Sequence, residues 1–99
     1  MKYPSTNSAL AERLWDELSQ ARGAKSSRPV ADLEDAAFRL YLPMARTLAR
    51  SVDQPADLNA AEQAAELGLA RAILAWRHRS SVGFRVFARS VILRQLQRP

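Results

Sequence analysis

Apolar residues in this chain recur every three or four positions, the period that places them on one face of an α-helix. β-branched residues are scarce, whereas Ala, Leu, Arg, Glu and Gln are frequent, and these residue types favour helix. Short polar or proline-containing stretches separate the periodic segments. The pattern predicts an all-α protein, a compact bundle of four to five helices.

The first predicted helix covers about residues 9–22 and ends at Gly23, a residue type common just past helix C-termini. Its apolar stripe consists of Leu10, Leu14 and Leu18. Residues 24–29 are mostly polar and are predicted to form a linker. Residues 1–30 therefore comprise an N-terminal helix and a linker. Residues 31–99 form a helical domain that is expected to make one structural unit with the first helix.

The second predicted helix begins near Asp32, a residue type that often caps helix N-termini, and ends before Asp53. Its apolar stripe consists of Leu33, Ala37, Leu40, Tyr41, Met44, Leu48 and Val52. Pro43 lies inside this segment, where a proline costs about 3 kcal/mol in a helix. The stripe keeps its phase across the proline. One kinked helix, or two helices that meet at residues 42–43, would satisfy both facts.

The third predicted helix begins after Asp57 and ends at about Trp76 or His78, and the last covers about Phe84 to Arg98. The predicted buried stripe of the third helix is Leu58, Ala61, Ala65, Leu69, Ala72, Ile73 and Trp76. One side of the last helix carries Phe84, Phe87, Ala88, Val91 and Ile92. Both tryptophans of the chain lie at or beside apolar stripes, so we expect them in the core.

Charge is sorted along the sequence. Residues 31–66 hold seven acids against three arginines, whereas residues 67–99 hold seven arginines and no acid, within a net charge of +5. These arginines are Arg71, Arg77, Arg79, Arg85, Arg89, Arg94 and Arg98. A small helical domain with this distribution is expected to present one positive and one negative face. Positive faces attract polyanions, of which nucleic-acid backbones are the commonest.

The residue types exclude several kinds of site. The chain has no Cys, which excludes disulfides and thiolate metal sites, and its single His78 cannot build a metal site alone. No glycine-rich phosphate loop or base-and-nucleophile set is present, so we expect neither an enzyme nor a cofactor. No apolar run approaches the roughly 18 residues needed to span a bilayer, and the N-terminus lacks the apolar stretch of a signal peptide. We expect a cytoplasmic protein.

The last helix alternates arginines with aromatic rings over residues 84–89. Arginines bind phosphates, and rings stack on unpaired bases at about 1–3 kcal/mol per base. Its guanidinium groups are expected to form one continuous strip. Phe84 and Phe87, at i and i+3, also have the spacing of core residues, so at least one is expected to be buried. A solvated face with arginines that serve solubility is the alternative interpretation.

The sequence resembles region 2 of bacterial sigma factors, the subunits that direct RNA polymerase to promoters. Three stretches carry the resemblance in the family's order: residues 41–50, residues 63–73 followed by Trp76, and residues 84–88 followed by Ile92. Residues 14–18 are similar to the short helix that precedes region 2 in the flagellar and stress subtypes. The likeness covers about residues 10–98 and includes no counterpart of the domain that reads the −35 element.

This resemblance implies two interfaces. Glu62, Gln63 and Glu66 on the third helix would dock on the coiled coil of the largest subunit of the RNA polymerase core. The last helix and the loop before it would hold the non-template single strand of the −10 promoter element. The DNA-binding residues implied are Arg79, Phe84, Arg85, Phe87, Arg89, Arg94, Gln97 and Arg98.

Departures from the family pattern leave two alternatives open. The acid that usually precedes the family's glutamine by three residues is Ala60 here, and Ala64 and Ala65 replace acidic or glycine positions. One alternative is therefore a degenerate sigma-like module that binds a regulator, such as an anti-sigma protein, or polymerase without melting DNA. The other is an unrelated basic helical DNA-binding domain.

Overall fold

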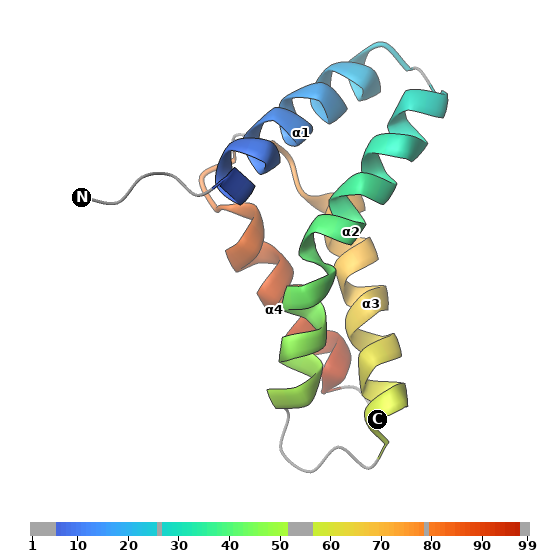
Figure 1. Cartoon of the computed structure of the whole chain (residues 1–99), viewed down its shortest axis with the longest axis vertical. Coiled ribbons are helices and arrows are strands. Elements are labelled where there is room, and N and C mark those ends of the chain that lie inside the picture. Colours follow the sequence, from blue (N-terminus) through green and yellow to red (C-terminus); the bar gives the residue numbers. More distant parts are fainter. Residues whose placement is uncertain (1–5, 26, 52–56, 79, 98–99) are drawn as a thin grey trace, which may run out of the picture. The chain divides into compact units, whose positions relative to one another are not determined.

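The chain folds into four α-helices in a computed structural model that describes residues 6–25, 27–51, 57–78 and 80–97 (Figure 1). The helices are α1 (Thr6–Gly23), α2 (Ser27–Ser51), α3 (Leu58–Ala75) and α4 (Phe84–Leu96). No strand occurs within the described ranges. The predicted all-α class is therefore confirmed.

Two compact units make up the chain, and the division falls inside α2. The N-terminal unit is Met1–Leu40 and the C-terminal unit is Tyr41–Pro99. The predicted union of residues 31–99 with the first helix stays a prediction. In the N-terminal unit, α1 and the first part of α2 form a helical hairpin (Figure 1), in which Arg22 Nη2 donates a hydrogen bond to Glu34 Oε2 at 2.8 Å.

The turn between α1 and α2 is shorter than the sequence suggested. Gly23 is still helical, and the residue with left-handed backbone is Lys25, at φ 57°. The linker predicted over residues 24–29 is wrong, because α2 already begins at Ser27. Asp32 is consequently inside the helix and does not cap it. The physical reason is that Pro29 stands in the first turn, where its missing N–H would have no helical acceptor in any case.

Helix α2 continues as one helix through Pro43, so the alternative of two helices that meet at this residue is wrong. A proline removes one intrahelical hydrogen bond. The acceptor affected is the carbonyl oxygen of Arg39, four residues earlier; the bond from Thr47 Oγ1 to the carbonyl oxygen of Pro43, at 2.9 Å, is a separate one. The proline ring is exposed, and the apolar face of the helix therefore keeps its phase on both sides.

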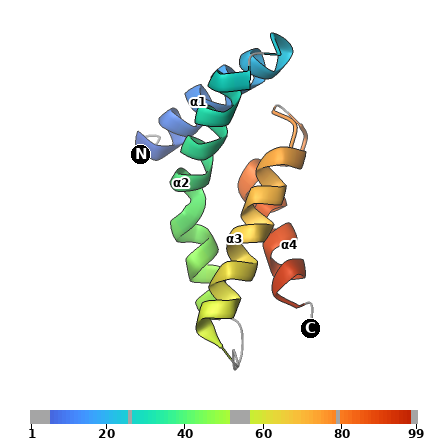
Figure 2. The same ribbon diagram turned by 90° about the vertical axis from the view of Figure 1, so that its right-hand side faces the viewer.

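In the C-terminal unit, α3 and α4 lie side by side and run antiparallel (Figure 2). Asp57 caps α3, since its Oδ1 accepts from the Asn59 N–H at 3.0 Å. Gly68 allows the two helices to approach closely. A Cβ at this position would lie only 2.9 Å from the Ile92 Cα, a distance that real Cβ contacts essentially never show.

Most of the buried residues lie on the predicted stripes, but Ala45, Ala49 and Gly68 are buried outside them, and Val52 lies outside the described residues. Buried positions of the C-terminal unit are Tyr41, Ala45, Ala49, Ala65, Gly68, Leu69, Ala72, Ile73, Trp76, Phe84, Ala88 and Ile92. Both tryptophans are buried, as predicted. Leu10 and Leu58 were expected on apolar stripes but are 49% and 44% exposed. Both belong to the N-terminal part of their helices, where an apolar residue in phase with the stripe has fewer packing neighbours.

Among the described residues no charged or polar side chain is buried. The interior of these ranges is formed by aliphatic and aromatic groups alone. None of the described helices is both long and apolar enough to cross a bilayer. Any chemistry that the chain performs with charged groups in these ranges takes place on partly or fully exposed surface.

Candidate nucleic-acid interface

The net charge of the chain resides in its C-terminal unit. Residues 41–99 contain nine arginines and four acids, whereas residues 1–40 contain six basic and six acidic residues. The whole net charge of +5 therefore belongs to the unit that contains α3 and α4. Such a concentration of positive charge on a domain of about 60 residues favours a polyanionic partner.

Helix α4 buries one face and leaves the opposite face in solvent. Phe84, Ala88 and Ile92, spaced by four residues, are buried. Val86 and Ser90 on the other side are exposed, Val86 at 67%. Gln97, just past the helix end, is exposed as well. The packing of α4 therefore fixes which side is available to a ligand.

The arginines of α4 lie on two flanks of this exposed face. Arg85 and Arg89 are four residues apart, which places them about 40° apart around the helix axis. Arg94 is about 180° from Arg85 and about 140° from Arg89 by the same geometry. All three are exposed. The expectation of one continuous guanidinium strip is therefore wrong, because the nine-residue step from Arg85 to Arg94 is two and a half helical turns.

No acid competes for these arginines. Helix α4 contains no Asp or Glu, and the ion pairs Arg22–Glu34 and Arg39–Asp35 both lie in the N-terminal unit. The Arg85 guanidinium lies 6.0 Å from the centroid of the Tyr41 ring, a distance at the outer limit of a cation–π contact. The arginine heads of α4 remain available to phosphate groups.

The two phenylalanines of α4 have different environments. Phe84 is 5% exposed, and its ring centroid lies 4.5 Å from that of Tyr41 and 5.5 Å from that of Trp76. Phe84 is thus part of the core and its ring faces are not offered to a base. Phe87 is half-buried and lies about 20° from Arg94 around the axis.

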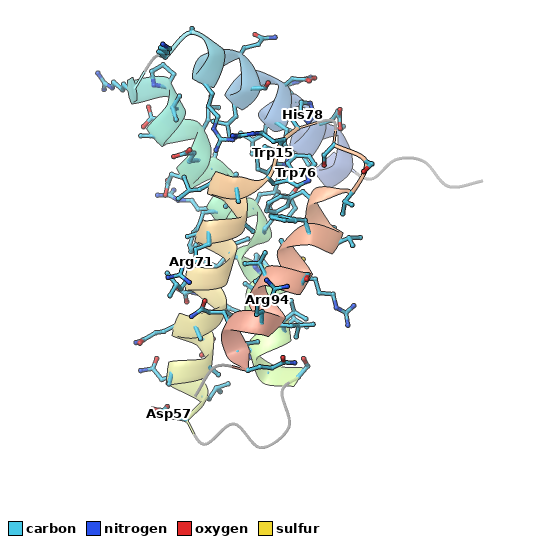
Figure 3. All side chains as sticks on the ribbon, turned by 180° about the vertical axis from the view of Figure 1, so that it is seen from behind. Trp15, Asp57, Arg71, Trp76, His78 and Arg94 are labelled. Atoms are coloured by element: carbon cyan, nitrogen blue, oxygen red, sulfur yellow. The ribbon has the colours of Figure 1, made fainter. Side chains whose placement is uncertain are left out.

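The segment between α3 and α4 is held by the indole of Trp76. Its Nε1 donates to the carbonyl oxygen of Val82 at 2.8 Å, and the Ser80 hydroxyl donates to the same oxygen at 2.8 Å (Figure 3 labels Trp76). These bonds fix the start of α4 against the end of α3. Two residues of the predicted DNA-binding set, Arg79 and Arg98, lie outside the described residues.

The predicted polymerase-binding residues lie within an arc of about 100° around α3 but differ in exposure. Gln63 is exposed, whereas Glu62 and Glu66 are half-buried. Glu62 and Glu66 stand about 40° apart, and Gln63 is about 60–100° from them. Two exposed leucines share the Gln63 side, Leu67 at 44% and Leu74 at 61%. That side of α3 is therefore more apolar than the sequence suggested.

Arg71 completes the basic surface and was not among the predicted site residues. Its Nη1 donates to Gln95 Oε1 at 3.0 Å, a bond between α3 and α4. Gln95 adjoins Arg94 in sequence, and Figure 3 shows Arg71 and Arg94 on the same visible face. The sequence feature that could have identified Arg71 is its position, because it is the first arginine of residues 67–99, the segment that contains no acid.

Comparison of the chain with protein-family models, curated proteins and solved structures finds no match. Placement, exposure and charge of the residues therefore define the candidate interface. Its components are the exposed arginines of α4, Arg71 beside them, and the uncharged residues that lie between the two flanks. Phe84 is no longer a candidate for ligand contact, because its side chain is buried.

Proposed function

We propose that the chain acts as a sigma-type transcription initiation module whose C-terminal unit binds promoter DNA through α4 and RNA polymerase through α3. The resemblance of about residues 10–98 to sigma region 2 suggested this function, and the all-α fold is compatible with it. The observation that carries the DNA-binding part is the exposure of Arg85, Arg89 and Arg94 with no acid on α4.

Counterion release gives this arrangement its energetic basis. Each arginine that neutralises a phosphate releases a condensed cation, and affinity then falls with salt at a slope of about −0.9 per contact on duplex DNA and about −0.7 on a single strand. The three arginines of α4 are exposed and form no ion pair with another described residue that would have to break first. Binding therefore loses none of its free energy to the rupture of internal salt bridges.

Fluorescence anisotropy on labelled promoter DNA at low salt tests the DNA part. The variant Arg85→Ala/Arg89→Ala should bind more weakly and with a shallower salt slope than the wild type. The matched control is Arg13→Ala/Arg28→Ala, which removes the same charge from exposed positions of the N-terminal unit. Equal losses in the two variants would mean that net charge alone, and not α4, drives binding, and the proposal would fail.

The polymerase part rests on the resemblance and on the mixed surface of α3. Half-buried Glu62 and Glu66, exposed Gln63 and exposed Leu67 give α3 both polar and apolar contact groups. Co-purification with RNA polymerase core tests it. The double substitution Glu62→Lys/Glu66→Lys should reduce the recovery of core polymerase. Glu17→Lys, at an exposed position of α1, should leave this recovery unchanged. No recovery of core polymerase by the wild type would contradict this part.

A second candidate is a sigma-like regulatory module that binds another protein without separating DNA strands. The burial of Phe84 at 5% exposure favours it, because strand separation benefits from rings that stack on unpaired bases. The exposed Leu67 and Leu74 supply an apolar patch suited to a protein contact. In the same co-purification, recovery of a regulatory protein without polymerase or DNA would select this candidate.

A further inference from the structure

Helix α4 carries arginines on both flanks of an uncharged outer ridge. The ridge consists of the exposed Val86, Ser90 and Gln97, with half-buried Leu93 between them. Its centre lies opposite the buried Phe84–Ala88–Ile92 face. Arg85 and Arg89 border the ridge on one side and Arg94 on the other, since these flanks are about 140–180° apart around the helix.

The second flank is reinforced from the neighbouring helix. Arg71 of α3 reaches Gln95 on α4 through the 3.0 Å hydrogen bond, and Figure 3 shows it on the same visible face as Arg94. Neither arginine forms an ion pair within the described part of the chain. Two cations, Arg94 and Arg71, therefore lie on the second flank, beside the C-terminal half of α4. Arg85 and Arg89 lie on the first flank, in the N-terminal half of the helix.

From this geometry we propose that α4 enters the major groove of double-stranded DNA, with each arginine flank on one of the two phosphate backbones. This inference rests on the DNA-binding part of the proposed function and specifies the form of the nucleic acid. An α-helix with its side chains is about 10–12 Å across, and the major groove of B-DNA is about 12 Å wide. The 13 residues of α4 extend for about 20 Å, enough to follow the groove across several base pairs.

A single strand does not fit this arrangement as well. It offers one row of phosphates, which could follow the Arg85 flank or the Arg94 flank but not both. Single-strand binding also relies on rings that stack on bases, and Phe84 is buried against Tyr41 and Trp76. Duplex RNA is excluded on shape, because its major groove is deep and too narrow for side chains to read.

The residues of α4 then divide into two roles. Arg85, Arg89 and Arg94 position the helix on the backbones and set affinity and salt dependence. Val86, Ser90 and Gln97 on the ridge face the edges of the bases. A glutamine pairs well with adenine, and an apolar side chain contacts the thymine methyl group, so the ridge chemistry favours A·T pairs.

Three labelled ligands of one sequence provide the test: duplex DNA, its single strand and the corresponding duplex RNA. The full chain should bind duplex DNA most tightly. On duplex DNA, Arg85→Gln/Arg89→Gln should reduce the magnitude of the salt slope by about 1.8, and Arg94→Gln should reduce it by about 0.9. Both reductions are expected because each arginine flank contacts a different DNA strand. The control variant Arg13→Gln/Arg28→Gln should leave the salt slope unchanged. Far-ultraviolet circular dichroism checks that every variant keeps its helix content.

A composition-matched swap provides the sharpest comparison. Arg94→Leu/Leu96→Arg keeps the charge and moves the cation to about 20° from Arg89, onto the first flank. It should weaken binding to duplex DNA several-fold and leave single-strand binding equal or stronger. Unchanged duplex affinity of the swap, or tighter binding of the wild type to single-stranded DNA or duplex RNA, would overturn the inference.

The outcomes separate this inference from the proposed function. Polymerase recovery together with tighter single-strand binding would retain the sigma-type function and reject groove entry. Tight duplex binding that depends on both flanks, without any recovery of polymerase, would retain groove entry and reject the initiation function. Absence of any nucleic-acid binding at low salt would reject both.

Discussion

Gly68→Ala tests the closest approach between α3 and α4. A Cβ at residue 68 would lie 2.9 Å from the Ile92 Cα and 3.4 Å from the Gln95 Cβ. Because the nearest atom is backbone, the two helices must move apart; no side chain can relieve the contact by turning away. An additional carbon in a packed contact of this kind costs about 1–3 kcal/mol, whereas alanine in place of glycine inside a helix stabilises it by about 1 kcal/mol.

The net expectation for Gly68→Ala is a destabilisation of up to about 2 kcal/mol, equivalent to a fall of up to roughly 16 °C in melting temperature for a domain of this size. Thermal unfolding followed by far-ultraviolet circular dichroism measures it. Gly68→Leu, which adds more atoms to the same contact, should lower the melting temperature further.

Gly23→Ala is the matched control for this experiment. A Cβ at Gly23 would meet nothing within 4 Å, and no described glycine has a positive φ. The substitution should leave the melting temperature unchanged or raise it slightly, through lower entropy of the unfolded chain. If Gly68→Ala unfolds at or above the wild-type temperature, the close packing of α3 on α4 cannot be as described.

Three further substitutions test single contacts by the same measurement. Trp76→Phe removes the hydrogen bond to the Val82 carbonyl and should cost about 0.5–1.5 kcal/mol, because this oxygen loses its indole donor but keeps the Ser80 hydroxyl; an unchanged melting temperature would contradict this. Asp57→Ala removes the N-cap of α3 and should cost about 0.5–2 kcal/mol, with Asp57→Asn close to wild type. Pro43→Ala restores an amide donor inside α2 and should stabilise the chain by up to about 3 kcal/mol; a lower melting temperature would show that the proline is favourable there.

The helices could be predicted from the sequence because the apolar period depends only on local spacing. α3 begins directly after Asp57 and α4 begins at Phe84, both as expected. The start of α2 could not be predicted, because residues 25–28 are polar and are followed by Pro29, features shared by linkers and by first helical turns. The exposure of Leu58 could not be predicted either. Periodicity indicates which face of a helix is apolar, but not how far along that face the neighbouring helix packs.

The candidate interface was predictable in its residues but not in its shape. Arg85, Arg89 and Arg94 were recognised from the acid-free composition of the last helix. Their division into two flanks follows from their spacing in a helix, but which side of α4 faces solvent between them required the phase of the buried face, which Phe84 fixes through its contacts with Tyr41 and Trp76. Arg71 was missed because its relation to α4 depends on a hydrogen bond across 24 residues of sequence.

Two spacings within α4 account for its surface. Phe84, Ala88 and Ile92 repeat every four residues and turn slowly around the axis, so one face stays buried. Arg85 and Arg89 share that spacing and remain together, but position 96, which would continue their flank, holds a leucine, and the next arginine comes at position 94. A helix that contacts two phosphate backbones needs cations on both sides and small or uncharged residues between them, and this is the order that the packing of α4 produces.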